Sequence, residues 1–81
     1  MADVRKRVGE NFRRARLQKG WSQEELGFRS GIHRTYISDL ERGTRNPSLT
    51  LLHDLATTLE MELSELVRLA NGSPPAANEG R

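Results

Sequence analysis

Residues 22–43 read SQEELGFRSGIHRTYISDLERG, and this stretch decides the fold. Ser22 is a favourable helix N-cap, and Glu25 stands three residues later, which completes a capping box. A helix over 23–30 is therefore predicted. Gly31 follows this helix and tolerates positive φ, so the chain is expected to turn sharply there.

A second helix is predicted over 34–42, with His33 at its N-cap and Gly43 as its C-terminal cap. Gly27 costs about 1 kcal/mol relative to alanine inside a helix, and close approach of the neighbouring helix would compensate for that cost. The apolar residues expected to fill the space between the helices are Leu26, Ile32, Ile37 and Leu40. Two short helices on such a turn are typical of a helix-turn-helix, whose second helix enters the DNA major groove.

Helical periodicity continues on both sides of this stretch. Helices are predicted over 4–19, over 49–59 with Ser48 as N-cap, and over 65–70 with Ser64 as N-cap. Their apolar stripes are Val4, Val8, Phe12 and Ala15, then Leu49, Leu52, Leu55, Ala56 and Leu59, and finally Leu66, Val67 and Leu69. The expected fold class is all-α, with one compact five-helix domain over 1–70. Residues 71–81 contain two prolines and no large apolar side chain, so a disordered tail is predicted there.

The composition excludes several classes of protein. The chain has 81 residues and no cysteine, which excludes disulfides and thiolate metal sites. No apolar run approaches the roughly 20 residues that span a bilayer, and no apolar leader is present, so we expect a cytoplasmic, nucleoid-associated protein. No paired carboxylates, nucleophile–base pair or phosphate loop appears, so neither enzymatic activity nor a cofactor or metal is expected.

The net charge of +2 is unevenly distributed. Residues 1–20 carry seven basic and two acidic side chains, whereas residues 46–81 carry two basic and five acidic ones. This uneven distribution of charge indicates a partner that is oriented electrostatically at the basic end, and nucleic acid is the default candidate. An ordinary solvated helix face would give a similar pattern.

Five motifs resemble those of the lambda-repressor-like helix-turn-helix family of the Xre type. They are VGxxFRxxR at 8–16, GWSQEEL at 20–26, SGI at 30–32, YISxLERG at 36–43 and NPSL at 46–49. Members of this family regulate transcription by binding DNA, usually as homodimers. The string GIHRTYIS at 31–38 and the short chain look most like the restriction–modification controller proteins, although similar strings occur in phage-type and host repressors. Gly27 departs from the family pattern, which usually has alanine there.

Base-reading contacts are expected from the outward face of the second helix. The candidates are Arg34, Thr35, Ser38 and Asp39. Arg34 suits guanine O6 and N7, and Thr35 suits a thymine methyl group or a base edge. Asp39 either accepts from cytosine N4 or orients Arg34 or Arg42, and the orienting role is favoured.

Contacts with the DNA backbone are expected around this face, from Ser22, Gln23, Tyr36, Arg42, Arg45, Asn46 and Arg13. The helix N-terminus at Gln23 also attracts phosphate, and the resemblance implies that its amide steadies the recognition helix. Arg45 suits the minor groove. Tyr36 either binds a phosphate or packs beneath its helix, and Arg13 and Arg14 either contact phosphates or stay solvated.

The resemblance implies a structural role for Arg16 and Glu41, as an internal ion pair between the first helix and the end of the third. Neither residue is then a DNA contact. Removing one partner would leave a partly buried charge alone, at a cost of about 3–5 kcal/mol if burial is deep.

A homodimer is expected because a single unit reads few bases. Two-fold pairing would place the recognition helices about 34 Å apart, one turn of a near-palindromic operator. The apolar residues expected at the dimer interface are Leu51, Leu63, Leu66, Val67 and Leu69. The alternative is that these side chains complete the core of the monomer.

The predicted function is sequence-specific regulation of transcription on double-stranded DNA, with a restriction–modification controller as the narrower hypothesis. An antitoxin or adaptor that keeps the fold as a protein-interaction module is the alternative. An antitoxin would need a further binding segment, and residues 71–81 lack apolar anchors for one. No second domain for an effector is evident, so no small-molecule effector is expected.

Overall fold

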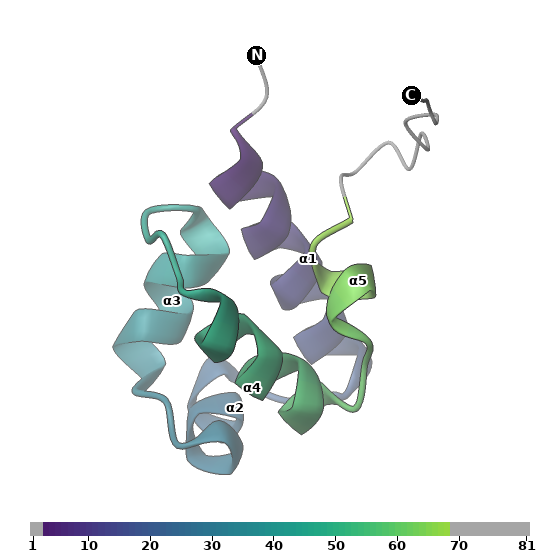
Figure 1. The fold of residues 1–81 in the computed structure, drawn as a ribbon. Coiled ribbons are helices and arrows are strands. Elements are labelled where there is room, and N and C mark those ends of the chain that lie inside the picture. Colours follow the sequence, from purple (N-terminus) through teal and green to yellow (C-terminus); the bar gives the residue numbers. More distant parts are fainter. Residues whose placement is uncertain (1–2, 69–81) are drawn as a thin grey trace.

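The structure is a computed structural model that describes residues 3–68, and within that range it is all-helical (Figure 1). The helices are α1 (Val4–Gln18), α2 (Gln23–Ser30), α3 (Arg34–Arg42), α4 (Leu49–Leu59) and α5 (Leu63–Leu66). None of these five described helices is long and apolar enough to cross a membrane. The predicted tail at 71–81 lies outside the described residues.

The bounds of the two central helices follow the predicted caps. Ser22 Oγ accepts a hydrogen bond from the Glu25 amide at 3.0 Å and opens α2. Gly31 ends that helix with φ 77°, and Gly43 ends α3 with φ 79°. His33 is the N-cap of α3, since its Nδ1 accepts from the Thr35 amide at 3.1 Å. These local contacts fix the lengths and the entry directions of both helices.

The last helix differs from the prediction. It begins at Leu63 rather than after Ser64, with Glu62 as its N-cap, and it ends at Leu66. Glu65 Oε1 accepts from the Glu62 amide at 3.2 Å, so an acidic side chain satisfies the first free N–H group and displaces the predicted serine cap. The turn before it is tight, because Glu60 adopts φ 59°.

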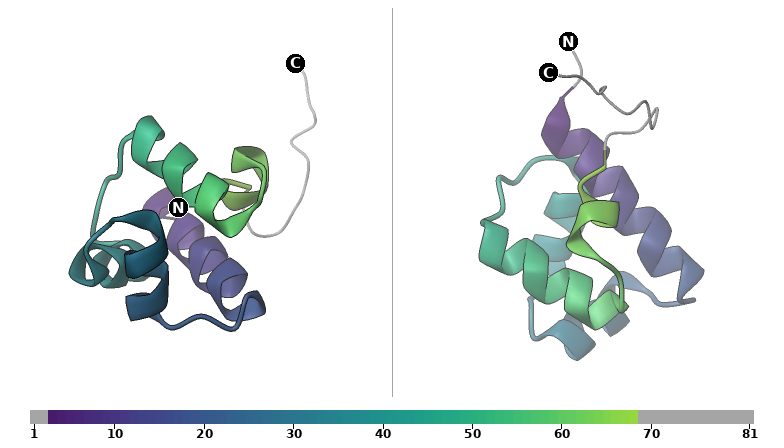
Figure 2. Two further views of the ribbon diagram at one scale, coloured as in Figure 1. Left: turned by 90° about the horizontal axis from the view of Figure 1, so that it is seen from below. Right: turned by 45° about the vertical axis from the view of Figure 1, so that its right-hand side comes forward.

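The core lies at the centre of the five helices. In Figure 1, α1 runs behind α4, with α3 on one side and α5 on the other, and the right view of Figure 2 shows α5 against α1. Helix α4 also contacts α2 and α5. The buried apolar side chains are Val8, Phe12, Ala15, Leu26, Ile37, Leu40, Leu55, Ala56, Leu59 and Leu66. Every helix contributes at least one of them, so detaching any helix would expose part of the core to water.

Three predicted placements of apolar residues are wrong. Val4 and Leu49, assigned to buried stripes, are 56% and 71% exposed. Each is the first residue of its helix, where the side chain extends beyond the neighbouring helices. Leu66, assigned to the dimer interface, is 0% exposed and belongs to the monomer core.

Helices α1 and α3 cross in close backbone contact at Gly9. A Cβ atom at this position would clash with the Leu40 carbonyl oxygen and would lie 2.7 Å from the Glu41 carbonyl oxygen. Only glycine allows this approach. The contact fixes the orientation of α3, the helix expected to enter the groove, against the longest helix of the domain.

Candidate nucleic-acid interface

The turn between α2 and α3 depends on the absence of a side chain at Gly27. A Cβ atom there would lie 2.8 Å from the Ile32 carbonyl oxygen and 3.3 Å from the Arg34 amide nitrogen. The glycine therefore lets the start of α3 lie directly against α2, as the sequence predicted. In consequence the first turn of α3 projects from the end of the motif.

Arg34 and Thr35 stand exposed on this first turn. Neither side chain makes a hydrogen bond to another residue within the described range 3–68, and only the backbone of Thr35 is engaged, by the cap at His33. An arginine with five free donors and a small hydroxyl at a helix N-terminus suit the edges of bases in the major groove.

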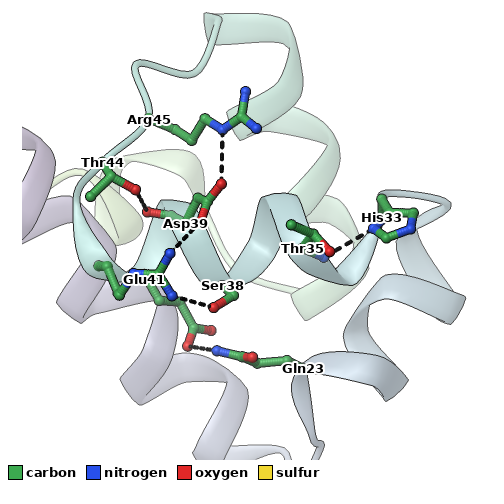
Figure 3. A network of polar contacts seen from close by, with 9 residues as sticks. Gln23, His33, Thr35, Ser38, Asp39, Glu41, Thr44 and Arg45 are labelled. Carbon is green, nitrogen blue, oxygen red and sulfur yellow. Dashed lines mark hydrogen bonds and ion pairs between the residues drawn. The ribbon is translucent and has the colours of Figure 1, made fainter.

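Four sequence-predicted residues are joined in one polar network (Figure 3). Arg42 donates to Ser38 Oγ at 2.8 Å and to Asp39 Oδ1, and Arg45 Nε donates to Asp39 Oδ2 at 3.2 Å. Thr44 donates through both its amide and its hydroxyl to the Asp39 carbonyl, each at 3.0 Å. Asp39 thus orients arginines, as favoured, and its partners are Arg42 and Arg45.

Tyr36 packs beneath its helix rather than standing free. Its ring is half-buried against the core, and the Arg45 guanidinium lies 4.8 Å from the ring centroid. This is cation–π distance, so the aromatic face provides a second restraint on Arg45. Of the two readings left open by the sequence, packing is the one that these contacts support.

A buried cluster behind this surface joins the recognition elements to the core. Arg16 Nε and Nη2 donate to the two Glu41 oxygens at 2.8 and 3.0 Å, in the ion pair that the resemblance implied. The Gln23 amide also donates to Glu41 Oε1, at 3.0 Å, and so steadies α3 (Figure 3). The hydrogen bonds to Glu41 hold the pKa of Arg16 above its usual value. One carboxylate therefore ties α1, α2 and α3 together.

A shallow hollow of about 260 Å³ gathers most of the predicted contacts. Its lining residues are Gln23, Arg34, Thr35, Ser38, Asp39 and Arg42. Arg45 and Asn46 lie exposed in the loop after α3, beside this hollow. Arg13 is not part of it: it lines a separate hollow with Glu10, Arg14 and Leu17. Ser22 is engaged as a helix cap.

Asn11 has a role that the sequence reasoning missed. Its side chain is buried in α1, and its amide donates to the carbonyl oxygens of Leu66 at 2.9 Å and Arg68 at 2.5 Å. Arg14 Nη1 donates to its Oδ1 at 3.0 Å. The sequence signal for this role was an uncharged polar residue on the buried stripe of the helix, three positions after Val8 and four before Ala15. Asn11 fixes the end of α5, next to the predicted dimer surface.

The arrangement is that of a DNA-binding helix-turn-helix. Within residues 3–68 no cluster of three metal-ligating side chains occurs. The site instead offers cations, a short hydroxyl and one carboxylate on a protruding helix, which is the chemistry of groove recognition.

Comparison with known proteins places the chain in a family. The helix-turn-helix family HTH_3 matches residues 12–66, most of the described domain, and the chain belongs to this family of transcriptional regulators. It is similar to the HTH-type transcriptional regulator y4dJ of Sinorhizobium fredii, with 47% identity over 72 residues, covering 89% of this chain and 94% of that protein.

Two solved structures are close in fold as well. The restriction-modification controller protein C.AhdI from Aeromonas hydrophila is 47% identical, with a TM-score of 0.74, covering 79% of this chain and 91% of that one. The controller protein C.Esp1396I, solved as a tetramer in complex with its natural 35 base-pair operator, is 30% identical, with a TM-score of 0.72. That match covers 83% of this chain and 97% of the other.

Proposed function

We propose that this protein is a sequence-specific, double-stranded DNA-binding regulator that acts as a homodimer on a near-palindromic operator and controls a restriction–modification locus. The observation that carries the proposal is the hollow on α2 and α3, where two unengaged side chains, Arg34 and Thr35, stand beside cations suited to phosphate. The similarity to C.AhdI and to the operator-bound C.Esp1396I supports the narrower assignment. Association with the nucleoid is part of this proposal.

Base readout and backbone contact are assigned to different residues. Arg34 reads a base, so Arg34→Ala should weaken binding to the selected site by about 1–3 kcal/mol and relax the preference at one base pair per half-site. Arg45 contacts the sugar–phosphate backbone, so Arg45→Ala should weaken binding without changing which base is preferred at any position.

Selection of binding sites from random duplex DNA tests the proposal. It should return a two-fold symmetric site with half-sites about one helical turn apart. Affinity should fall with salt by about 0.9 log units per log unit of salt for each phosphate neutralised. Arg29→Ala is a matched control, because Arg29 pairs with Glu25 and does not line the hollow. Equal losses on the selected and a scrambled duplex for Arg34→Ala would contradict base readout.

The dimer surface is proposed on the outer side of α4 and α5. Leu51 and Leu63 are half-buried there and Val67 is 36% exposed, whereas Leu66 is buried in the core of the monomer. Leu69 lies outside the described residues. Partly exposed apolar side chains near the acidic residues Glu62 and Glu65 fit an interface that faces away from DNA.

Sedimentation at micromolar concentration tests this interface. The wild type should be a dimer, and Val67→Glu should shift it to monomer without unfolding it. Val4→Glu, on the first turn of α1, is the matched control because Val4 is also an exposed valine. A wild type that sediments as a monomer would overturn the proposed dimer.

A further inference from the structure

One carboxylate restrains two arginines on the surface that would face DNA. Asp39 is the negatively charged member of the six side chains that line the hollow. It is 20% exposed and accepts from Arg42 with one oxygen and from Arg45 with the other. Both of its oxygens are therefore occupied by cations that are themselves well exposed.

Each arginine also has a second restraint. Arg42 donates to Ser38 Oγ, and Arg45 lies over the Tyr36 ring. The Arg42 guanidinium group and the Nε of Arg45 are thereby engaged within the protein, and the positive charge of both side chains is partly neutralised where a phosphate would otherwise meet it. The three charged side chains together present a net charge of +1 rather than the +2 of the two arginines alone.

Contact with any DNA would set phosphates in competition with Asp39 for these arginines. If the arginines turned to phosphates, the carboxylate would be left without partners and close to a polyanion, which is unfavourable. A hydrogen-bond donor on the DNA relieves this penalty. The exocyclic amino group of cytosine, N4, is the groove donor that a carboxylate recognises.

We propose that Asp39 is a specificity-determining residue. On DNA without a suitably placed cytosine it keeps Arg42 and Arg45 away from phosphates. Where a cytosine amino group donates to its carboxylate in their place, both arginines are released to the phosphates. This inference rests on the proposed function, because it requires α3 to enter a groove. Asp39 thus suppresses binding to sequences that lack the amino group, in addition to favouring those that carry it.

The test compares Asp39→Asn with wild type on two duplexes. One is the site selected by the wild-type chain from random DNA, and the other is a scrambled sequence of equal length. Asp39→Asn should bind the scrambled duplex about fivefold more tightly, and its ratio of selected to scrambled affinity should fall by roughly fivefold per half-site. Repeated selection with the variant should lose the preference for cytosine at one base pair per half-site.

Asp54→Asn is the matched control for net charge, since Asp54 is an exposed carboxylate on α4. It should leave the affinity ratio unchanged. Asp39→Ser is expected to behave as Asp39→Asn does, and it keeps the test open should the asparagine variant fail to fold.

One result would overturn the inference alone: the ratio of selected to scrambled affinity stays at the wild-type value in Asp39→Asn. If both affinities fall equally, Asp39 only positions arginines for phosphates. A wild type without any sequence preference would instead overturn the proposed function, and the inference with it.

Discussion

Replacement of Glu41 by alanine should bring the domain close to unfolding. The Glu41 side chain is 3% exposed and that of Arg16 is 8% exposed, so the ion pair is shielded from solvent. Glu41 accepts two hydrogen bonds from Arg16 and one from Gln23. Truncation at Cβ removes all three at once and leaves a guanidinium buried without its counter-charge.

The magnitude follows from these contacts. Breaking one side of a buried pair costs about 3–5 kcal/mol. Arg16 keeps its hydrogen bond to the Trp21 carbonyl oxygen at 2.8 Å, which favours the lower end, ~3 kcal/mol. A domain of this size is stable by roughly 3–10 kcal/mol in total. Because each kcal/mol shifts the melting midpoint of a small domain by about 4–8 °C, the midpoint should fall by at least ~12 °C.

Thermal melts followed by far-UV circular dichroism and by Trp21 fluorescence measure this loss. Glu10→Ala, an exposed acid on α1, serves as the control and should melt like the wild type. The double variant Arg16→Met with Glu41→Met removes both charges together and should recover more than half of the loss, since no charge stays buried alone. A Glu41→Ala midpoint within about 2 °C of wild type would refute the reasoning.

Three further predictions concern stability. Gly9→Ala should destabilise the domain by about 2 kcal/mol or more, as measured by denaturant unfolding. Overpacking alone costs ~1–3 kcal/mol, and the added Cβ atom would also force the backbone of α3 to shift. Glu10→Ala, at the neighbouring exposed position, should have little effect. Asn11→Ala should cost about 1–3 kcal/mol, because the buried Leu66 carbonyl and the partly buried Arg68 carbonyl lose their donor, and calorimetry should detect the loss. The Lys19 ammonium, hydrogen-bonded to Glu60, holds the pKa of that carboxyl below 4.5. The ion pair therefore stabilises the fold at pH above 4.5, and this contribution is lost as the pH falls through the lowered pKa of Glu60. In Lys19→Met, the free energy of unfolding should fall less steeply with decreasing pH in the acid range. An equally steep fall in the variant would contradict this prediction.

The sequence predicted most of what is decided locally. The caps at Ser22, His33 and Ser48 and the glycine turns lie where the structure has them, because each depends on contacts within a few residues. The start of α5 was not predicted, because Glu62 and Ser64 both qualify as caps and the choice depends on how the chain leaves the tight turn at Glu60.

Burial was harder to predict at the helix ends. Val4 and Leu49 continue their apolar stripes in sequence, but the neighbouring helices stop short of them. Leu66 was assigned to an interface because periodicity does not tell which apolar residue a small core will accommodate. The role of Asn11 depends on the approach of α5 to α1, a contact between residues more than fifty positions apart. Only tertiary packing determines such contacts.

For the candidate site, the sequence predicted which residues lie on the exposed face of α3 and that Asp39 orients an arginine. Its pair with Arg42 follows from their spacing on one helix. That Asp39 also holds Arg45 was not predictable, because it depends on the path of the loop after α3, which the Thr44 contacts to the Asp39 carbonyl fix.

The freedom of Arg34 and Thr35 from any duty in the fold has a consequence for how such a regulator acquires new targets. Within the described chain their side chains make no hydrogen bond, so substitution there should leave the melting temperature almost unchanged. On the base-reading role proposed for them, duplicated copies of the gene can diverge in their DNA targets through these two codons while the rest of the scaffold stays constant. Retargeting through Glu41 or Gln23, by contrast, would require the scaffold itself to be rebuilt.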